Sequence, residues 1–197
     1  MTVLRIIGAG GHGKVVAETA QVSGFDDVAF LDAAWPNRTE NGRWRVVGKP
    51  ETGAYSLFCA VGRNAVRSTI FDQFDLWDSP VLRHPSAVVS PSATLGGGVV
   101  VVAGAIVNAD ARLGHGVILN TGCSVDHDCT VSDFAHLSPG ARLAGGVRVG
   151  ARSWVGIGAV VREGVHVGAD VTVGAGAVVV ADIEDGATVV GVPARRI

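Results

Sequence analysis

The segment ILNTGCSVDHDCTVSDFAHLSPGARLAGGVRV, residues 118–149, decides the fold of the second half of the chain, because an aliphatic residue returns in it at every sixth position. The same period runs without an insertion from Val89 to Val179 and covers sixteen positions. An α-helix has about 3.6 residues per turn and cannot place residues of that spacing on one face. The period therefore indicates a repeating unit of six residues. The aliphatic positions are Val89, Leu95, Val101, Val107, Leu113, Leu119, Val125, Val131, Leu137, Leu143, Val149, Val155, Val161, Val167, Val173 and Val179.

A second series, of small or β-branched residues, stands two positions before the aliphatic ones, as Cys123 stands before Val125. Glycine, asparagine or aspartate directly follows the aliphatic residue in nine of the sixteen hexads, and these residue types tolerate the backbone of a tight corner. Each hexad thus predicts a short strand and a turn. Such a repeat forms a solenoid, and hexads suit a triangular β-helix in which residues one coil apart are stacked at about 4.8 Å.

The composition excludes some classes of function. The chain has 197 residues, is 48% hydrophobic and 17% charged, and carries a formal net charge of −2, which predicts neither nucleic-acid nor membrane binding. No signal peptide precedes the first expected strand, so we expect a cytoplasmic protein. Of the three cysteines, Cys123 and Cys129 fall in the small inward series, and we expect them to fill the core.

The N-terminal part predicts a nucleotide-binding fold. Residues 3 to 7 indicate a buried strand, which a glycine-rich turn from Gly8 to Gly13 and an amphipathic stretch follow. The turn fits G-x-G-x-x-G, and Asp32 ends the next expected strand where a ribose-binding acid stands in a dinucleotide fold. The α/β part closes by about residue 84, however, and holds only about half of the sheet that a dinucleotide needs. We therefore expect a mononucleotide diphosphate at the turn. The alternative is that these glycines only form a tight turn between the strand and the helix and bind no ligand.

We expect two domains. The first, residues 1–82, is the small Rossmann-like α/β domain, in which a strand over residues 56–61, a turn at Gly62 and a helix over residues 64–74 complete the sheet. The second, residues 83–197, is the all-β solenoid. The prolines between Pro80 and Pro91 forbid a continuous helix across the junction.

His127 is the histidine that we expect to do chemistry. It follows Asp126 at a corner of the repeat, and the adjacent Asp128 can orient the ring or raise its basicity. One coil further on, Gly145 leaves the space over that corner open and its backbone N–H free. A base with an N–H donor about one coil away is what acyl transfer to an amine requires. From the residues alone, a solvated corner histidine remains the alternative.

Three segments carry a resemblance that covers the whole chain: GAGGHG at residues 8–13, residues 118–141, and the ending GVPAR at residues 191–195. In these segments the chain resembles the bacterial sugar-nucleotide N-acetyltransferases, which acetylate UDP-4-amino-sugars and GDP-perosamine and belong to the hexapeptide-repeat acyltransferases. The resemblance implies a left-handed β-helix, acetyl-CoA as co-substrate, and a homotrimer with acetyl-CoA bound between subunits.

The resemblance also implies residue roles. His127 would be the general base, Asp128 its supporting acid, and Gly145 the donor that faces the thioester carbonyl. Acetyl-CoA would contact His136, Ile157 and Ala175. The nucleotide-sugar site would use Gly10, Gly11, His12, Asp32, Gly62 and Asn120. Two departures, Ala33 and Ala65, stand where the family often has acids, so the preference for base or sugar can differ.

We therefore expect an acetyl-CoA-dependent N-acetyltransferase that acts on a nucleotide-linked 4-amino-4,6-dideoxyhexose, for surface glycan or glycoprotein synthesis. The alternatives are an O-acetyltransferase on a sugar hydroxyl and a non-catalytic trimeric scaffold that binds nucleotides. A metal enzyme on the same β-helix would need a close histidine pair, and no H-x4-H occurs, so we expect no metal. His115 and His166 are expected to be exposed turn residues.

Overall fold

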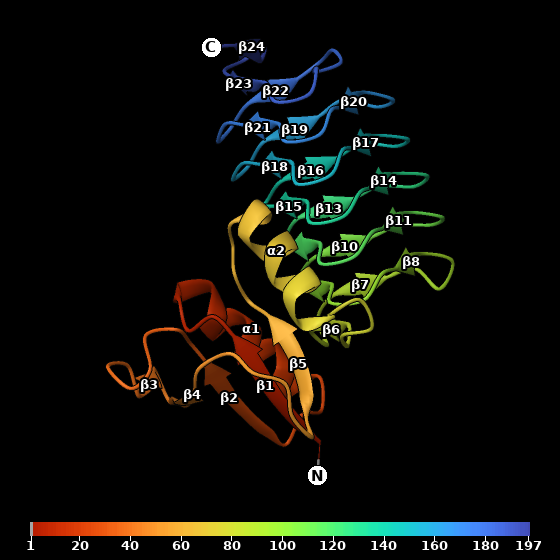
Figure 1. Ribbon diagram of the computed structural model, residues 1–197. Coiled ribbons are helices and arrows are strands. Elements are labelled where there is room, and N and C mark those ends of the chain that lie inside the picture. Colours follow the sequence, from red (N-terminus) through yellow and green to blue (C-terminus); the bar gives the residue numbers. More distant parts are fainter. Residues whose placement is uncertain (1) are drawn as a thin grey trace.

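The computed structural model describes residues 2–197 and contains a small α/β part followed by a long solenoid (Figure 1). The α/β part holds one five-stranded sheet with strand order β3-β4-β2-β1-β5. Strands β1, β2, β4 and β5 run parallel, and β3 pairs antiparallel with β4. Its elements are β1 (Val3–Ile7), α1 (Gly11–Val22), β2 (Asp27–Leu31), β3 (Glu40–Asn41), β4 (Trp44–Gly48), β5 (Ser56–Cys59) and α2 (Asn64–Phe74).

The two helices pack on opposite faces of this sheet, because side chains alternate along a strand. Leu4 and Ile6 of β1 share a buried cluster with Val16 of α1. Ile7, on the other face, shares a cluster with Phe71 of α2. Neither helix could cross a membrane, since the longer of these two described helices has only 12 residues.

Each coil of the solenoid contributes one short strand to each of three parallel sheets, which we call face 1, face 2 and face 3 in chain order. Face 1 contains β6, β9, β12, β15, β18, β21 and β23, with β24 paired antiparallel to β23; face 2 contains β7, β10, β13, β16, β19 and β22; face 3 contains β8, β11, β14, β17 and β20. The turns between them form corner 1–2, corner 2–3 and corner 3–1. The strands are β6 (Leu82–Arg83), β7 (Val88–Val89), β8 (Thr94–Leu95), β9 (Val100–Val101), β10 (Ile106–Val107), β11 (Arg112–Leu113), β12 (Ile118–Leu119), β13 (Ser124–Val125), β14 (Thr130–Val131), β15 (His136–Leu137), β16 (Arg142–Leu143), β17 (Arg148–Val149), β18 (Trp154–Val155), β19 (Val160–Val161), β20 (His166–Val167), β21 (Thr172–Val173), β22 (Val178–Val179), β23 (Thr188–Val190) and β24 (Arg195–Arg196).

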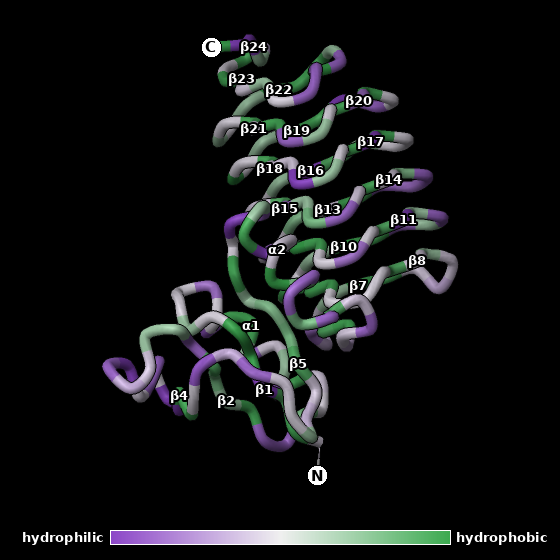
Figure 2. The backbone as a smooth tube through the Cα atoms, viewed as in Figure 1, coloured by the Kyte–Doolittle hydropathy of each residue, from purple (hydrophilic) through white to green (hydrophobic). Residues whose placement is uncertain are grey.

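The register between stacked strands is eighteen residues from β6 to β22, as in the pairing of Val107 with Val125 and of Val125 with Leu143. In the last coil, Thr172 of β21 pairs with Thr188 of β23, sixteen residues further on. The aliphatic and small series both point into one continuous core, and in Figure 2 hydrophobic residues recur along the coils. Cys123 and Cys129 are buried in it as free thiols, as expected. The sequence-based prediction of a β-helix behind a Rossmann-like α/β part is thus confirmed.

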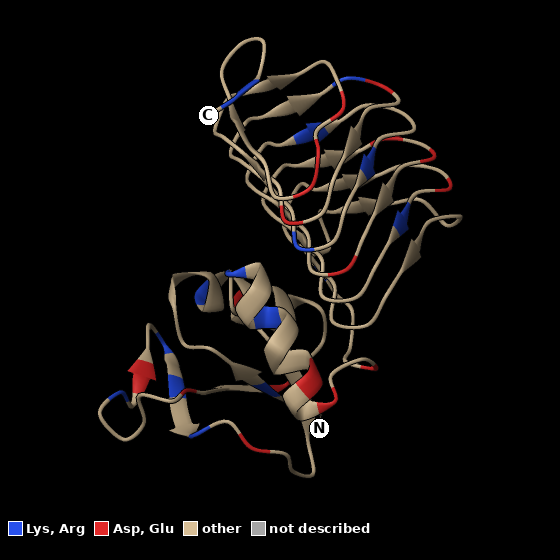
Figure 3. Cartoon of the chain, turned by 45° about the horizontal axis from the view of Figure 1, so that its top comes forward, with Lys and Arg blue, Asp and Glu red and all other residues tan. Residues whose placement is uncertain are grey.

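The α/β part rests against face 1 and corner 3–1. Leu82, Val100 and Ile118 point outward from face 1, yet they are buried in the cluster that contains α1. At corner 3–1, Phe134 packs edge-on against Phe71 of α2, with ring centroids 5.0 Å apart. The charged residues of the solenoid are spread over its turns and short strands (Figure 3). Because one cluster crosses the expected boundary near residue 82, the division into two domains remains a proposal about units that share a core.

Candidate active site

His127 lies at corner 2–3, in the turn between β13 and β14, and its side chain is 61% exposed. Its Nδ1 is 2.8 Å from Oδ2 of Asp128. The hydrogen bond with Asp128 and the negative charge of Asp126 raise the pKa of His127. The imidazole is therefore oriented and made more basic, while its Nε2 forms no hydrogen bond within residues 2–197 and faces solvent.

Gly145 lies one coil above His127 and touches the imidazole. A Cβ placed on Gly145 would be 2.6 Å from Cε1 and 2.7 Å from Nε2 of the ring, so any side chain at this position would displace the imidazole. The carbonyl of Gly145 accepts the Gly164 N–H at 3.0 Å, but the Gly145 N–H itself donates to no described residue. A basic ring and a free N–H thus lie side by side at this corner.

Asp126 stabilises the same corner by accepting two hydrogen bonds. Its Oδ1 accepts the backbone N–H of His127 at 2.8 Å and the Nδ2 of Asn108, one coil earlier, also at 2.8 Å. These hydrogen bonds lower the pKa of Asp126, with that of Asn108 as the larger cause, so the carboxylate is held ionised beside the base. Asn108 was not singled out from the sequence, and its signal is its place eighteen residues before Asp126.

The glycine turn joins β1 to α1 and leaves backbone open for a ligand. A Cβ at Gly10 or Gly11 would meet no atom within 4 Å, whereas a Cβ at Gly13 would lie 2.5 Å from the Gly8 carbonyl oxygen. Gly10, the N-cap of α1, provides no side-chain cap, and the first turn has no acidic residue. The first N–H groups of α1 are therefore available to an anion.

Asp32 serves the turn itself in this structure. Its Oδ2 accepts the Ala9 N–H at 2.7 Å, and its Oδ1 accepts the Ala34 N–H at 2.9 Å. The Nη1 of Arg38 lies 3.6 Å from the same Oδ2. The carboxylate thus ties the glycine turn to the loop after β2, and a hydrogen bond from it to a ribose remains a prediction.

The helix α2 begins at the same edge of the sheet. It follows β5, the parallel neighbour of β1, so the N-termini of α1 and α2 lie next to one another. Its N-cap, Arg63, makes no side-chain cap hydrogen bond, and the first turn carries no acid. A Cβ at the preceding Gly62 would meet nothing within 4 Å. The N-termini of α1 and α2, neither of which has a side-chain cap, therefore lie close together beside Gly10, Gly11 and Gly62.

His136 is buried between the two parts, on face 1. Its ring stacks on Trp154 at 5.2 Å, and it lies 6.0 Å from the ring of His12 in α1. Asn120 accepts the Thr121 N–H through Oδ1, so its Nδ2 donates to Nε2 of His136 at 3.2 Å. This hydrogen bond leaves the proton of the neutral ring on Nδ1, which makes no hydrogen bond of good geometry within the described chain. The backbone of Gly62 lies near enough to the ring to act against the lowering of its pKa.

Burial keeps both of these imidazoles neutral. It lowers the pKa of His136 to about 3, with further contributions from His12 and Arg67, and lowers the pKa of His12 to about 4, with a contribution from Arg67. Nε2 of His12 is also buried without a partner in the described residues. Two ring nitrogens are thus buried without a hydrogen-bond partner of good geometry where α1 meets face 1.

Arg67 is the residue that sequence reasoning missed. It lies on α2, is 1% exposed, and donates to Gly116 and Phe134 carbonyls of the solenoid at 2.8 and 2.6 Å. Its other donors reach the Val61 carbonyl at 2.9 Å and the Gly62 carbonyl at 3.1 Å.

A fifth hydrogen bond joins Arg67 to Oδ1 of Asn64 at 2.9 Å, and Asn64 itself donates to the carbonyls of Arg152 and Ser153. Burial lowers the pKa of Arg67 to about 10, so it stays charged at neutral pH. No carboxylate of the described residues pairs with it. The signal in the sequence was an arginine four positions before Phe71, on the apolar side of the helix.

The remaining predicted acetyl-CoA contacts lie at corner 1–2. Ile157 follows β18 and is 56% exposed, and Ala175, one coil above it, is also exposed. Asn120 begins the same corner two coils below Ile157. Ile157 and Ala175 thus expose two apolar side chains at this corner, one coil apart.

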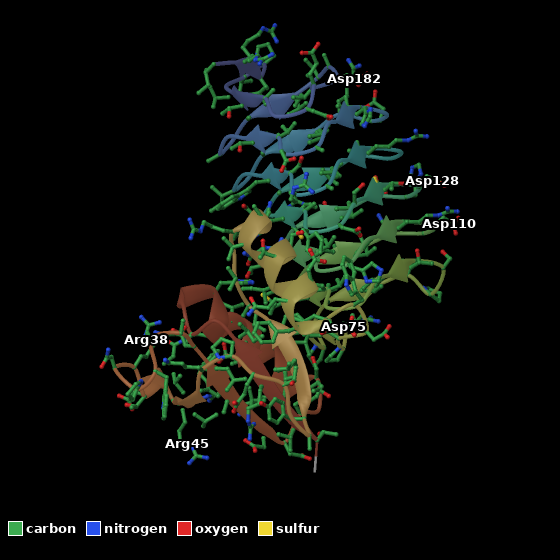
Figure 4. The ribbon with its side chains drawn as sticks, in the orientation of Figure 1. Arg38, Arg45, Asp75, Asp110, Asp128 and Asp182 are labelled. Carbon is green, nitrogen blue, oxygen red and sulfur yellow. The ribbon has the colours of Figure 1, made fainter. Side chains whose placement is uncertain are left out.

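The structure divides the predicted site residues of one chain into two groups. Every contact of the α/β part with the solenoid named above falls on face 1 or corner 3–1, and His136 and Asn120 belong to that side. His127, Asp128 and Gly145 occupy corner 2–3, opposite face 1. Figure 4 shows Asp128 on the side of the solenoid away from α2 and the sheet. One chain therefore does not bring its base to its own nucleotide turn.

Two histidine expectations need correction. His115 is half-buried at corner 3–1, where its ring meets Trp77 edge-on at 5.3 Å and its Nδ1 accepts the Gly97 N–H, because α2 and the following loop cover that corner. His166 is exposed as expected, but it lies on β20 and not in a turn. Within the part of the chain that the structure describes, no cluster of three or more potential metal ligands occurs.

Comparison with known proteins agrees with this architecture. Residues 3–74 match the PglD N-terminal domain family, and residues 146–181 match the bacterial transferase hexapeptide family (six repeats). Fold and site thus define a hexapeptide-repeat transferase with a PglD-type N-terminal domain. UDP-N-acetylbacillosamine N-acetyltransferase of Bacillus subtilis (strain 168) is 40% identical over 114 residues, 52% of each chain, so the match spans about half of this curated relative.

Two solved structures match over nearly their full length. The acetyltransferase domain of PglB from Neisseria gonorrhoeae FA1090, in complex with acetyl coenzyme A, is 45% identical, with 98% of each chain covered and a TM-score of 0.92. PerB from Caulobacter crescentus, in complex with CoA and GDP-perosamine, is 42% identical, with 100% of this chain and 98% of that chain covered and a TM-score of 0.92. The chain belongs to the sugar-nucleotide N-acetyltransferase family that these proteins represent.

Proposed function

We propose that this protein transfers the acetyl group of acetyl-CoA to the amino group of a nucleotide-linked 4-amino-4,6-dideoxyhexose, in the cytoplasm, where both substrates are metabolites. The observation that carries the proposal is the arrangement at corner 2–3, in which the basic ring of His127 touches Gly145 and its free N–H. Family membership supports it, since relatives are named for N-acetylation of a UDP- or GDP-linked amino-sugar.

In the proposed reaction, the sugar amine attacks the thioester carbonyl carbon while Nε2 of His127 accepts a proton from the amine. The C–N bond forms, the C–S bond breaks, and the CoA sulfur leaves and is protonated. Asp128 holds the imidazole through Nδ1, so Nε2 is the ring nitrogen left free to accept a proton. The Gly145 N–H stabilises the oxyanion of the tetrahedral intermediate. No covalent enzyme intermediate is needed.

The two groups of site residues are proposed to meet across subunits of a homotrimer. Corner 2–3 of one subunit would face the nucleotide turn of its neighbour, so that Gly10, Gly11, His12, Asp32, Gly62 and Asn120 hold the nucleotide-sugar and His127 of the next chain reaches the amine. The separation of these groups in one chain supports this assembly. Light scattering that showed an active monomer would refute it.

Acetyl-CoA is proposed to lie along corner 1–2. The methyl and methylene groups of its pantetheine arm fit the exposed side chains of Ile157 and Ala175. Its amide groups are proposed to contact His136, whose Nδ1 is buried in the single chain. The residues present thus suit acetyl-CoA, which supplies the activated acetyl group. No metal enters the proposed reaction.

The acceptor is tested by supplying acetyl-CoA with a UDP- or GDP-4-amino-4,6-dideoxysugar, the matching 4-hydroxy sugar nucleotide, and the free amino-sugar. We expect turnover of the nucleotide-linked amine only, because energy from the remote nucleotide orients the amine. Faster turnover of the hydroxyl compound would make the protein an O-acetyltransferase, and binding without turnover would leave a scaffold. His127→Ala should lower turnover by about two to four decades with both ligands still bound.

A further inference from the structure

A cavity of about 410 Å³ lies at the carboxyl edge of the α/β sheet, on the face that α2 covers. Ile7 at the end of β1 forms part of its floor, and Ala33 and Lys49 follow the ends of β2 and β4. Ile70, Gln73 and Phe74 of α2 complete it; their spacing puts them on one face of the helix. None of the roles assigned above uses this cavity.

The position of the cavity matches one part of a nucleotide. In open α/β sheets, ligands bind outside the carboxyl ends of the strands, and here the two uncapped helix N-termini mark the place for phosphates. Ile7, which directly precedes the glycine turn, lines the cavity, whereas Ile70, Gln73 and Phe74 belong to the last turns of α2. A nucleotide held by its phosphates at the helix N-termini would therefore have to extend past Ile7 to place its base in the cavity. The size of the cavity lies within the range of small-ligand sites.

The lining indicates which kind of base fits. Ile7, Ile70 and Phe74 offer apolar surface to a planar ring. At the rim, the carboxamide of Gln73 offers one acceptor and two donor hydrogens, and the ammonium of Lys49 offers donors only. The cavity lining contains no aspartate or glutamate, and Ala33 occupies the position after Asp32.

Uracil and thymine present a carbonyl, an N–H and a second carbonyl along one edge. The Gln73 oxygen suits the N–H, and the Gln73 and Lys49 donors suit the carbonyls. Guanine instead presents two adjacent N–H donor groups, which need an acceptor pair such as a carboxylate. Family membership leaves the base open, because relatives are named for UDP-linked and for GDP-linked sugars.

We propose that this cavity is the nucleobase subsite and that Gln73 and Lys49 select a uracil or thymine nucleotide over a guanine nucleotide. The inference rests on the proposed function for the identity of the ligand as a nucleotide. It assigns Gln73 and Lys49 to base recognition and gives them no part in acetyl transfer.

The test is calorimetric titration of the wild-type protein with UDP, dTDP and GDP, without acetyl-CoA. We expect UDP and dTDP to bind about tenfold or more tightly than GDP, the scale of one matched base edge. Gln73→Glu supplies the carboxylate that guanine needs, so the ratio of the two dissociation constants should shift towards GDP by a similar factor. Lys49→Met should weaken UDP binding.

Matched controls lie outside the cavity: Gln21→Glu on α1 and Arg45→Met on β4 are both exposed changes of the same kind and should leave the ratio unchanged. Tighter binding of GDP by the wild type, or an unchanged ratio in Gln73→Glu, would overturn the inference. Base-selective binding without acetyl transfer would refute the proposed function alone, and acetyl transfer with equal affinity for all three nucleotides would refute this inference alone.

Discussion

Two inactive variants of this protein should restore activity when they assemble together. His127→Ala removes the base at corner 2–3. Gly11→Asp adds a carboxylate at the N-terminus of α1, where the backbone has room for a side chain, and repels a diphosphate without disturbing the fold. Each variant alone should be nearly inactive, because every site in it carries one lesion.

In a mixed trimer, each site combines corner 2–3 of one chain with the nucleotide turn of its neighbour. With equal amounts and random assembly, the corner is intact in half of the sites and the turn in half, so about one quarter of all sites are complete in a closed ring. The mixture should therefore show about one quarter of wild-type turnover per site. If base and turn came from the same chain, no complete site could form.

The assay is co-expression of the two variants with different tags, tandem purification of mixed trimers, and acetyl-CoA turnover on the best nucleotide-linked amino-sugar. Double purification selects trimers with two chains of one kind and one of the other, in which one site in three is complete, as a count around the ring shows. Pairing His127→Ala with Gly145→Ala is the control, since both lesions lie in the same corner. Mixed trimers no more active than either parent would refute a site shared between chains.

Further predictions concern single residues. Gly145→Ala should displace the ring of His127 and lower turnover with the melting temperature almost unchanged, which kinetics and thermal unfolding together would check. Asp128→Asn replaces the carboxylate that raises the pKa of His127 by a neutral and weaker acceptor. Because the reaction needs a neutral imidazole, the acid limb of the kcat profile should move to lower pH while the maximal rate falls. Arg67→Met leaves the buried carbonyl groups that accept from Arg67 without a donor, and should lower the free energy of unfolding by about 3–5 kcal/mol in urea titrations. The pKa of His136 is lowered from 6.5 to about 3, so between these two pH values the folded state binds fewer protons than the unfolded state. The free energy of unfolding should therefore be unaffected by this group above about pH 6.5 and should fall by about 1.4 kcal/mol per pH unit below it, down to about pH 3. This slope should flatten in His136→Gln.

Periodicity predicted the solenoid well because its information is local. The inward positions of Val125 and Leu143 can be predicted from the local repeat, without any information on distant parts of the chain. The adjacency of His127 and Asp128 follows from the sequence itself. The contact of Gly145 with the imidazole followed from the coil length alone. These features depend on the eighteen-residue register that the structure shows.

Features that depend on how the α/β part rests on the solenoid could not be predicted in the same way. His136 was expected to contact a ligand, but its burial beside His12 depends on which face the α/β part covers. The expected helix over residues 64–74 gives Arg67 no special role. Its role as a bridge requires carbonyl groups at Gly116 and Phe134, which lie in turns of two successive coils.

The register of the solenoid also restricts how the length of this chain can change during evolution or engineering. Inserting a single hexad would turn every strand above it from one face to the next, so a base at corner 2–3 would move to another edge of the triangle. Inserting a whole coil preserves orientation and raises the upper part by about 4.8 Å. Between residues 116 and 153 even a whole coil would strain the anchorage, because α2 binds turns of successive coils there. Tolerated length changes should therefore lie above residue 153 and come in multiples of one coil, except in the last coil, where β21 and β23 already pair with a register of sixteen residues.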